Sequence, residues 1–582
     1  MVPVENLEME EQNWLKNVYQ GNKIKELTIK VLIIGTILGA LLIASNIYMG
    51  LKTGFTEGGS IISAILAFAI IKALKGKFSV LENNMAQTMA SAAASIGIMV
   101  SAIPALIMLG YNFTGFELFL WIFLVSVLGI LFAIPLRKQM VVIEKITFPS
   151  GTACAATIKA MHSHGDEAIK RAKVIGLTGL FAGLFTWFRD AVPVFIPSMT
   201  MLPGKIGGHP AGRLMLGINW SPMLFGVGFL VGPRIGLSLL LGAAIGWGIL
   251  APVLANAQII EGIGYRQITS WTMWVAVAIM VTSSFTSLAL RGGTIVKSFQ
   301  SMRGSKLSKN SHIEISFRFW LVSILVTSII TAIIMSAFFN IPIWMTFLAI
   351  VLSFILAVVA IRAYGETDIS PVGAMGYTTQ LIYGGVAPGN MITNVMSAGI
   401  TAGSAQQSSD MMQDLKTGYL LGATPRKQVY VQFIGSLIGA IIAVPVFLAI
   451  TGAYGLGTEN LPAPSAVTWS GMAKLLSQGF SVLPPHTWIG ILCGAFLGIL
   501  LTILGSTKLR KFTPSPIGLG IAMVVPGFFS ISIFLGSMIH FFIGKTFPKW
   551  MESYKTSVAS GGIAGEGVMG VIISILKVSG VF

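Results

Sequence analysis

Long apolar runs recur from one end of the chain to the other, and a short polar connection separates each run from the next. The runs lie at 30–50, 56–74, 85–110, 116–136, 172–197, 219–232, 235–257, 268–290, 317–339, 341–363, 428–451, 486–505, 516–544 and 559–579. At about 20 apolar residues of helix per bilayer crossing, the pattern predicts an all-α polytopic integral membrane protein with about 16 transmembrane helices.

Two further regions, 370–388 and 389–407, are apolar but rich in Gly, Ser and Thr. We expect them to form short spans or re-entrant hairpins. Irregular backbone at membrane depth is tolerated where it is buried in protein or lines a water-filled cavity. The sequence therefore predicts re-entrant or broken helices around a central path.

A basic, Ser-rich connection at 291–316 divides the chain. It predicts an N-terminal cytoplasmic tail at 1–29, a first membrane half at 30–290, a cytoplasmic connection at 291–316 and a second membrane half at 317–582.

The stretch "NMAQTMASAAASIG" at 84–97 shares Asn, Met, Ser, Ala and Gly with "NMITNVMSAGITAG" at 390–403. This similarity predicts two related halves, an arrangement found in many secondary transporters. The alternative is a chance match between low-complexity helices of small residues. Small side chains also let membrane helices approach closely. We expect these two segments to line the path.

Only 10% of the residues are charged and 54% are hydrophobic, whereas soluble proteins carry about 25% charged residues. The net charge of +17 is concentrated in short connections, as in the cytoplasmic loops of membrane proteins. Lys23, Lys25 and Lys30 precede the first apolar run and predict a cytoplasmic N-terminus in a multi-pass protein of the cell membrane. No nucleic-acid partner is expected.

Carboxylates inside or beside apolar segments are candidates for function, because ionisable groups in spans are costly and usually face a cavity or a partner. Glu82 and Glu566 are two of them. Arg189 and Asp190 are adjacent in another apolar run, where opposite charges most often pair for structure.

The stretch "IRAYGETDISPVGAMG" at 361–376 contains Tyr364, Glu366 and Asp368. We expect an apolar helix to end at Arg362, with a break at Gly365. Broken helices of this kind form substrate and ion sites in transporters. The alternative is a cytoplasmic helix end with solvated charges, and the sequence leaves both interpretations open.

The stretch "SSDMMQDLKTGYLLGATPRKQ" at 408–428 is unusually charged for this chain. Asp410 and Asp414 are four residues apart and share one face of a helix. Small and polar residues precede them as far as Gln406 and are suited to a wet cavity. The cations expected to neutralise the aspartates are Lys416, Arg426 and Lys427. The alternative is an ordinary basic loop capped by two aspartates.

The chain contains no Walker A motif, nucleophile elbow, HExxH motif or dinucleotide fingerprint. We therefore expect a transporter driven by an ion gradient, rather than an enzyme, with no cofactor and no resident metal. A membrane-embedded transferase or hydrolase, or a channel, remains an alternative.

Several stretches, in order along most of the chain, resemble the oligopeptide transporter family, and its yellow-stripe-like and prokaryotic branch more than its peptide branch. They are "ENNMAQT" (82–88), "TFPSGTACA" (147–155), "LSLLLGAAIGWGILAP" (237–252), "AYGETD" (363–368), "SDMMQDLKTGYLLGATPRKQVYVQFIG" (409–435) and "GIAGEGVMG" (562–570). The first matches the family pattern at Glu82, Asn83, Gln87 and Thr88. Glu566 stands where the family is expected to have aspartate.

The NPG and KIPPR signatures of the peptide branch are not found. The resemblance implies proton-coupled import of small oligopeptides or metal chelates. The expected partners are that solute, protons and the lipid bilayer, with homo-oligomerisation left open.

Overall fold

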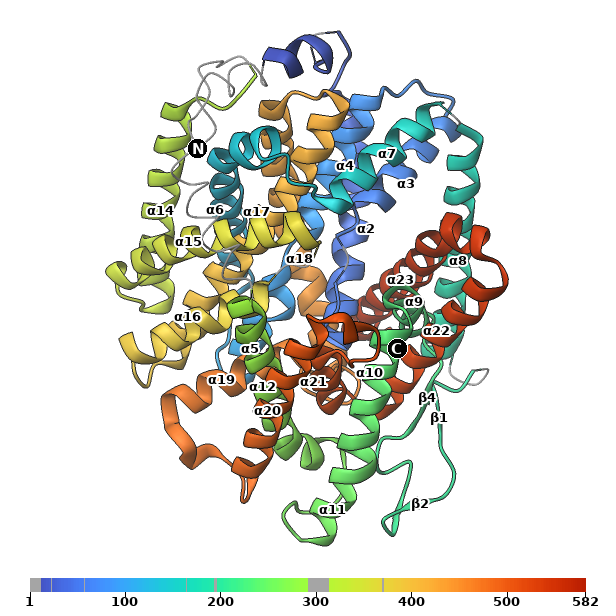
Figure 1. Cartoon of the computed structure of the whole chain (residues 1–582), viewed down its shortest axis with the longest axis vertical. Helices are drawn as coiled ribbons and strands as arrows, with labels where there is room; N and C mark the ends of the chain where they lie inside the picture. Colours follow the sequence, from blue (N-terminus) through green and yellow to red (C-terminus); the bar gives the residue numbers. More distant parts are fainter. Residues whose placement is uncertain are drawn as a thin grey trace.

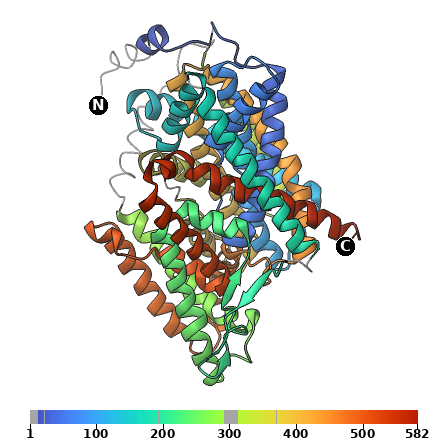
Figure 2. The same ribbon diagram turned by 90° about the vertical axis from the view of Figure 1, so that its right-hand side faces the viewer.

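The computed structural model describes residues 12–581 except 22, 57, 164, 193–195, 291–312 and 369–370, and shows a nearly all-helical chain (Figures 1 and 2). The first-half helices are α2 (Ile29–Thr53), α3 (Ser60–Ala73), α4 (Val80–Ala94), α5 (Ala102–Met108), α6 (Gly115–Arg137), α7 (Pro149–Ser163), α8 (Gly165–Asp190), α9 (Pro222–Val231), α10 (Pro233–Ala243), α11 (Ala251–Asn256) and α12 (Tyr265–Leu290). The second-half helices are α14 (Phe317–Phe339), α15 (Ile343–Thr367), α16 (Val372–Val386), α17 (Met391–Leu421), α18 (Pro425–Tyr454), α19 (Pro464–Gln478), α20 (Thr487–Gly505), α21 (Pro516–Val524), α22 (Gly527–Thr546) and α23 (Pro548–Val578).

Short elements complete the fold. A 3-10 turn, η1 (Gly97–Val100), follows α4, and π-helical segments η2 (Lys138–Ile143) and η3 (Ala244–Leu250) continue α6 and α10. Two antiparallel pairs lie between α8 and α9: β1 (Met199–Met201) with β4 (Gly217–Asn219), in which Thr200 pairs with Ile218, and β2 (Lys205–Ile206) with β3 (His209–Pro210).

Eleven helical segments of the described residues are long and apolar enough to cross a membrane. The architecture therefore agrees with an all-α multi-pass membrane protein, while the count of about 16 and the relation between two halves stay predictions. The predicted run 516–544 is two helices, because Pro526 interrupts it between α21 and α22. Most of the predicted connection 291–316 lies outside the described residues.

α17 corrects one expectation about the second half. Region 389–407 forms no hairpin: it is the first part of a 31-residue helix. The helix is too polar to be counted among the eleven, yet almost all of its residues are buried because it packs against α6, α15, α16 and α18. Neighbouring helices thus shield it from lipid.

The expected break at Gly365 is also wrong. α15 continues to Thr367 and ends at Asp368, whose φ is 59°. A Cβ on Gly365 would lie 2.8 Å from side-chain atoms of Ile146 and Phe148, so glycine is used here for close packing inside a helix rather than to end one.

Exposed apolar side chains cover the outer helices. On α14 these include Val322 and Leu325, exposed by 59% and 54%, and on α20 they include Leu492 and Phe496, at 61% and 65%. Such extended apolar faces suit contact with lipid tails. The two helices therefore lie at the periphery of the membrane domain.

α8 and α23 approach each other through glycines. A Cβ on Gly565 of α23 would lie 2.1 Å from the carbonyl oxygen of Gly179 in α8, and a Cβ on Gly561 would lie 2.7 Å from that of Ile175. Backbone atoms cannot yield as a flexible side chain does. The pair is therefore closely packed, as is typical of small residues in membrane helices.

We expect Gly565→Ala to destabilise the protein by about 1–3 kcal/mol, the usual cost of overpacking. Thermal unfolding of the purified protein in one detergent measures the change. Gly176→Ala is the matched control, because a Cβ there meets no atom within 4 Å. Equal thermal unfolding midpoints for Gly565→Ala and Gly176→Ala would show that α8 and α23 can move apart without loss of stability.

Candidate functional site

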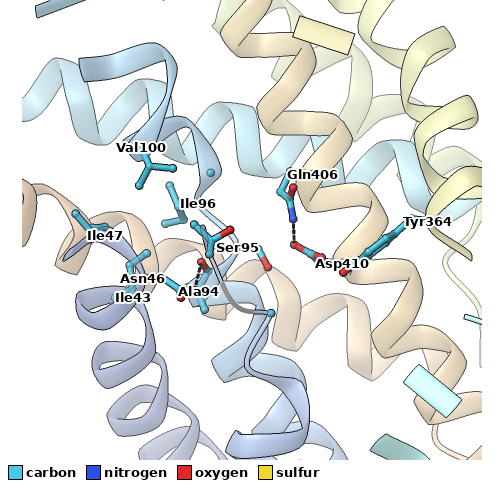
Figure 3. A pocket seen from close by; sticks show the side chains of 13 residues that line it. Ile43, Asn46, Ile47, Ala94, Ser95, Ile96, Val100, Tyr364, Gln406 and Asp410 are labelled. Carbon is cyan, nitrogen blue, oxygen red and sulfur yellow. Dashed lines mark hydrogen bonds between the residues drawn. The ribbon is translucent and has the colours of Figure 1, made fainter. Parts of the chain in front are cut away.

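A central cavity of about 260 Å³ lies beside the segment between α4 and α5, where the helix is interrupted (Figure 3). We call this interruption the break. Its walls come from α2, the break, the end of α15 and the middle of α17. The lining residues are Ile43, Asn46, Ile47, Thr56, Gly58, Ala94, Ser95, Ile96, Gly97, Val100, Tyr364, Gln406 and Asp410. The cavity lies among several of the residues predicted for the path, which itself stays a prediction.

The break gives the cavity polar backbone. α4 ends at Ala94, and the carbonyl of Ala94 accepts a bond of 3.4 Å from Asn46 Nδ2 instead of continuing the helix. The 3-10 turn η1 begins at Gly97. Non-helical backbone at membrane depth is stable only where protein or cavity water satisfies it. The break therefore brings polar backbone to the wall of the cavity.

Asp410 extends from α17 into this cavity. Gln406 Nε2, one turn earlier, donates to Asp410 Oδ2 at 2.7 Å, and the hydroxyls of Ser95 and Tyr364 also interact with the carboxylate. The Asp410 residue is only 6% exposed. Three of the predicted site residues, Tyr364, Gln406 and Asp410, are thus brought together.

Asp414 lies one turn further along α17 and is 1% exposed. Its carboxylate accepts hydrogen bonds from Gln432 Nε2 at 2.7 Å, Gln87 Nε2 at 3.2 Å and Ser60 Oγ at 3.4 Å. Asp410 and Asp414 lie four residues apart in the continuous helix α17, so the prediction that they share one helix face is confirmed. Polar side chains of α3, α4 and α18 surround Asp414.

The predicted neutralising cations do not contact these aspartates. Lys416 Nζ lies 5.8 Å from the ring centroid of Tyr419, Arg426 donates to the Tyr430 hydroxyl, and Lys427 pairs with Glu26 at 3.3 Å. No described Lys or Arg forms a salt bridge with Asp410 or Asp414. The reason is geometric: positions 414 and 416 are two apart and point to different sides of a helix.

Buried amides extend the polar surface beyond Asp414. Asn83, Asn84 and Gln87 of α4 are fully buried, and Gln428 of α18 donates to the Asp414 carbonyl oxygen at 2.8 Å. Both polar atoms of each asparagine, and Oε1 of each glutamine, have no hydrogen-bond partner among the described residues. Buried polar atoms are normally paired, and unpaired ones indicate water or a ligand. We call Asp410, Asp414, Gln87, Asn83 and Asn84 the polar seam.

Glu366 and Asp368 lie outside the cavity. Arg362 binds Glu366 at 3.0 Å and Glu144 at 2.6 Å. Asp368 accepts bonds from Ser150 Oγ and Gln413 Nε2, both at 2.6 Å. Both acids are exposed, so this geometry favours the solvated helix end over the broken-helix site.

Glu82 is at the start of α4, where it forms a capping box with Ser79 and accepts a hydrogen bond of 2.8 Å from Thr28 Oγ1. Its carboxylate satisfies free backbone N–H groups at the helix start. This position gives Glu82 a structural role rather than a place in the cavity.

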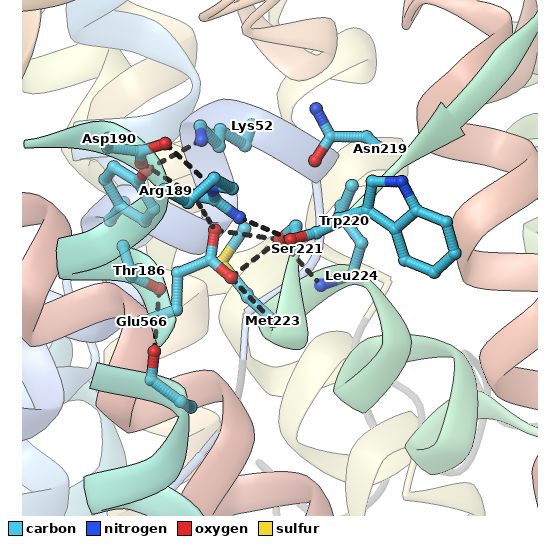
Figure 4. A network of polar contacts seen from close by, with 12 residues as sticks. Lys52, Thr186, Arg189, Asp190, Asn219, Trp220, Ser221, Met223, Leu224 and Glu566 are labelled. Atoms are coloured by element: carbon cyan, nitrogen blue, oxygen red, sulfur yellow. Dashed lines mark hydrogen bonds and ion pairs between the residues drawn. The ribbon is translucent and has the colours of Figure 1, made fainter. Parts of the chain in front are cut away.

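Glu566 belongs to a second buried network (Figure 4). It accepts from Ser221 Oγ at 2.7 Å, from the Met223 N–H at 2.9 Å and from Arg189 Nη2 at 3.1 Å. Arg189 also forms a two-pronged ion pair with Asp190, with both contacts at 2.6 Å. The predicted Arg189–Asp190 pairing is confirmed, and the network fixes α8, α9 and α23 to one another.

The N-terminal segment, residues 12–28, reaches the turn between α17 and α18. Trp14 Nε1 donates to the Tyr419 carbonyl at 2.8 Å and its ring stacks on Tyr419 at 5.3 Å. Glu26 accepts a hydrogen bond of 2.8 Å from Thr424 Oγ1. Burial raises the pKa of the Glu26 carboxyl, while hydrogen bonds from Thr424 and the charge of Lys427 oppose that rise. Nothing in the sequence indicated this contact.

Among the described residues, no group of three His, Cys, Asp or Glu side chains is placed to hold a metal ion. The cavity instead offers one carboxylate, two amides, hydroxyls and an apolar wall. Such a surface can bind a small polar solute and exchange a proton with it.

Comparisons with known proteins extend over nearly the whole chain. The family model described as OPT oligopeptide transporter protein matches residues 26–577. YGL114W of Saccharomyces cerevisiae, which carries the name of an oligopeptide transporter, is 27% identical over 94% of this chain and 96% of its own. A Haemophilus influenzae protein with the same kind of name is 28% identical over 91% and 92%. YSL12 of Oryza sativa, which carries the name of a metal-nicotianamine transporter, is 29% identical over 79% and 70%.

Proposed function

The chain belongs to the OPT oligopeptide transporter family, whose members are transporters rather than enzymes, and from this premise we propose that it is a proton-coupled importer of small oligopeptides or metal chelates in the cell membrane. We place its N-terminus in the cytoplasm, because lysines precede α2.

One observation carries the proposal: the cavity at the break after α4 contains Asp410, and a second buried carboxylate, Asp414, lies one turn away. Neither forms a salt bridge with a cation of the described residues. Buried carboxylates of this kind are typical of proton relays in transporters. In the proposed cycle the solute occupies the cavity, and a proton enters and leaves through the polar seam.

Uptake into proteoliposomes tests the proposal. We expect saturable uptake of a dipeptide or tripeptide, or of ferric nicotianamine, that rises with an inward proton gradient and collapses with a protonophore. Uptake that ignores the gradient would contradict proton coupling, and flux that never saturates would favour a channel.

We expect Gly97→Leu to abolish most of this uptake. Gly97 lines the cavity, and a Cβ there would meet only Gln406 Cγ, at 3.7 Å, so the added side chain enters the cavity without a backbone clash. Gly385→Leu is the matched control, because a Cβ on Gly385 meets nothing within 4 Å. Normal uptake by a folded Gly97→Leu protein would show that the cavity is not on the path.

A further inference from the structure

A second pocket, of about 600 Å³, lies far from the N-terminal segment, among helices of the lower part of Figure 1. It is formed by α12, α19, the ends of α5 and α21, and the loop between α18 and α19. Its lining residues are Met108, Tyr265, Arg266, Thr269, Ser270, Met273, Leu456, Gly457, Val467, Ser470, Lys474 and Val524. None of them lines the central cavity.

Two of the residues that line this pocket, Arg266 and Lys474, are cations. Arg266 is exposed and Lys474 is half-buried, and no described carboxylate forms a salt bridge with either. Three of the pocket hydroxyls, those of Thr269, Ser270 and Ser470, each donate to a backbone carbonyl of their own helix. The charged donors that line the pocket are the Arg266 guanidinium and the Lys474 ammonium.

One carboxylate partly offsets the positive charge of Arg266 and Lys474. Glu459, in the loop between α18 and α19, is half-buried and acts electrostatically on Tyr265. Two cations against one anion leave an excess of one positive charge. Clefts lined by one sign of charge attract oppositely charged solutes and speed their association.

Size and lining agree with a small-molecule site. Such sites have volumes of about 300–1,000 Å³ and combine an apolar wall with a few placed polar groups. Here Met273, Leu456 and Val467 provide apolar contact, and Arg266 can bind a carboxylate through two parallel hydrogen bonds. Lys474 supplies a separate point charge for a second acidic group.

We propose that this pocket is a docking site for a solute that carries two or more carboxylates on a short aliphatic body. This inference rests on the proposed transport function, because it names the chemical class of solute that would bind here before it is transported. It predicts that the transported peptide or chelate is acidic. An anionic lipid headgroup shares this chemistry and is separated from a free solute by the test.

The test measures how fast charged reagents modify a thiol in the pocket. These rates depend on the local charge and require no transport. Ser270→Cys, introduced together with Cys493→Ala, places one accessible thiol four residues from Arg266, and Cys154 is buried. The protein is held in phosphatidylcholine nanodiscs, and the thiol is modified with sulfonate-bearing or trimethylammonium-bearing methanethiosulfonate. We expect Arg266→Gln with Lys474→Gln to lower the ratio of the two rates, sulfonate over trimethylammonium, by about tenfold.

Two matched arms complete the experiment. Glu459→Gln removes the opposing charge and is expected to raise the same ratio. Citrate, compared with sodium chloride at equal ionic strength, is expected to slow modification only while Arg266 and Lys474 are present. A ratio that ignores all three charges, or citrate that gives no protection, would overturn the proposal.

Nanodiscs containing phosphatidylglycerol distinguish the two anion sources. If this lipid protects the thiol and citrate adds nothing, the site holds a headgroup and the solute proposal is overturned. The outcome is independent of the uptake assay: inactive proteoliposomes with normal citrate protection would count against the transport proposal alone.

Discussion

Asp414→Asn is expected to abolish gradient-driven uptake while the protein remains folded. Asparagine has nearly the same shape, and Gln87, Gln432 and Ser60 can reorient to bond its amide. What the substitution removes is the ability to bind and release a proton at the centre of the polar seam. We therefore expect uptake driven by a proton gradient to fall to background, and exchange of labelled for unlabelled solute to persist.

Asp368→Asn is the matched control, because Asp368 accepts comparable hydrogen bonds but lies at an exposed helix end. Lys416→Met should also retain uptake, since Lys416 does not pair with Asp414. Wild-type uptake in Asp414→Asn would remove the polar seam from the proposed proton route, as would equal losses in both aspartate variants.

The largest loss of stability is expected from Arg189→Met. Arg189 is 3% exposed and binds two carboxylates, so its removal leaves the buried Glu566 and the partly buried Asp190 without their shared cation. Breaking a buried pair in this way costs about 3–5 kcal/mol. Thermal unfolding in detergent at matched lipid content should show the loss, and Arg189→Met with Glu566→Leu should recover part of it.

Arg318→Met is the control for this variant. Arg318 is exposed at the start of α14, where substitutions usually change stability by less than about 0.5 kcal/mol. Equal unfolding midpoints for Arg189→Met and Arg318→Met would contradict a stabilising role for the network.

Apolar length alone predicted the outer helices well. The expected span 317–339 corresponds to α14, because a lipid-facing helix is a continuous apolar run. It failed for α17. There Gly399 and Gly403 lower helix propensity, but a Cβ on either would lie within 2.7 Å of a neighbouring side chain. Close packing outweighs propensity, and composition does not show which neighbour is present.

The candidate site was predictable only in part. Spacing along one helix places Asp410 and Asp414 on one face, and the structure confirms this. It could not supply their partners, because Gln87 is 327 residues from Asp414. Choosing partners from nearby sequence gave Lys416, which points elsewhere. Ser221, which bonds Glu566 from 345 residues away, had no signal at all.

The contact between Trp14 and Tyr419 has a consequence for biosynthesis. The two residues are 405 positions apart, so Trp14 leaves the ribosome long before Tyr419 of α17 is translated. At roughly 5–20 residues per second the delay is on the order of tens of seconds. During that time Trp14 has no Tyr419 to stack on. The contact between Trp14 and Tyr419 therefore reports the stage of synthesis, because a nascent chain in which it has formed has already been translated past Tyr419 of α17.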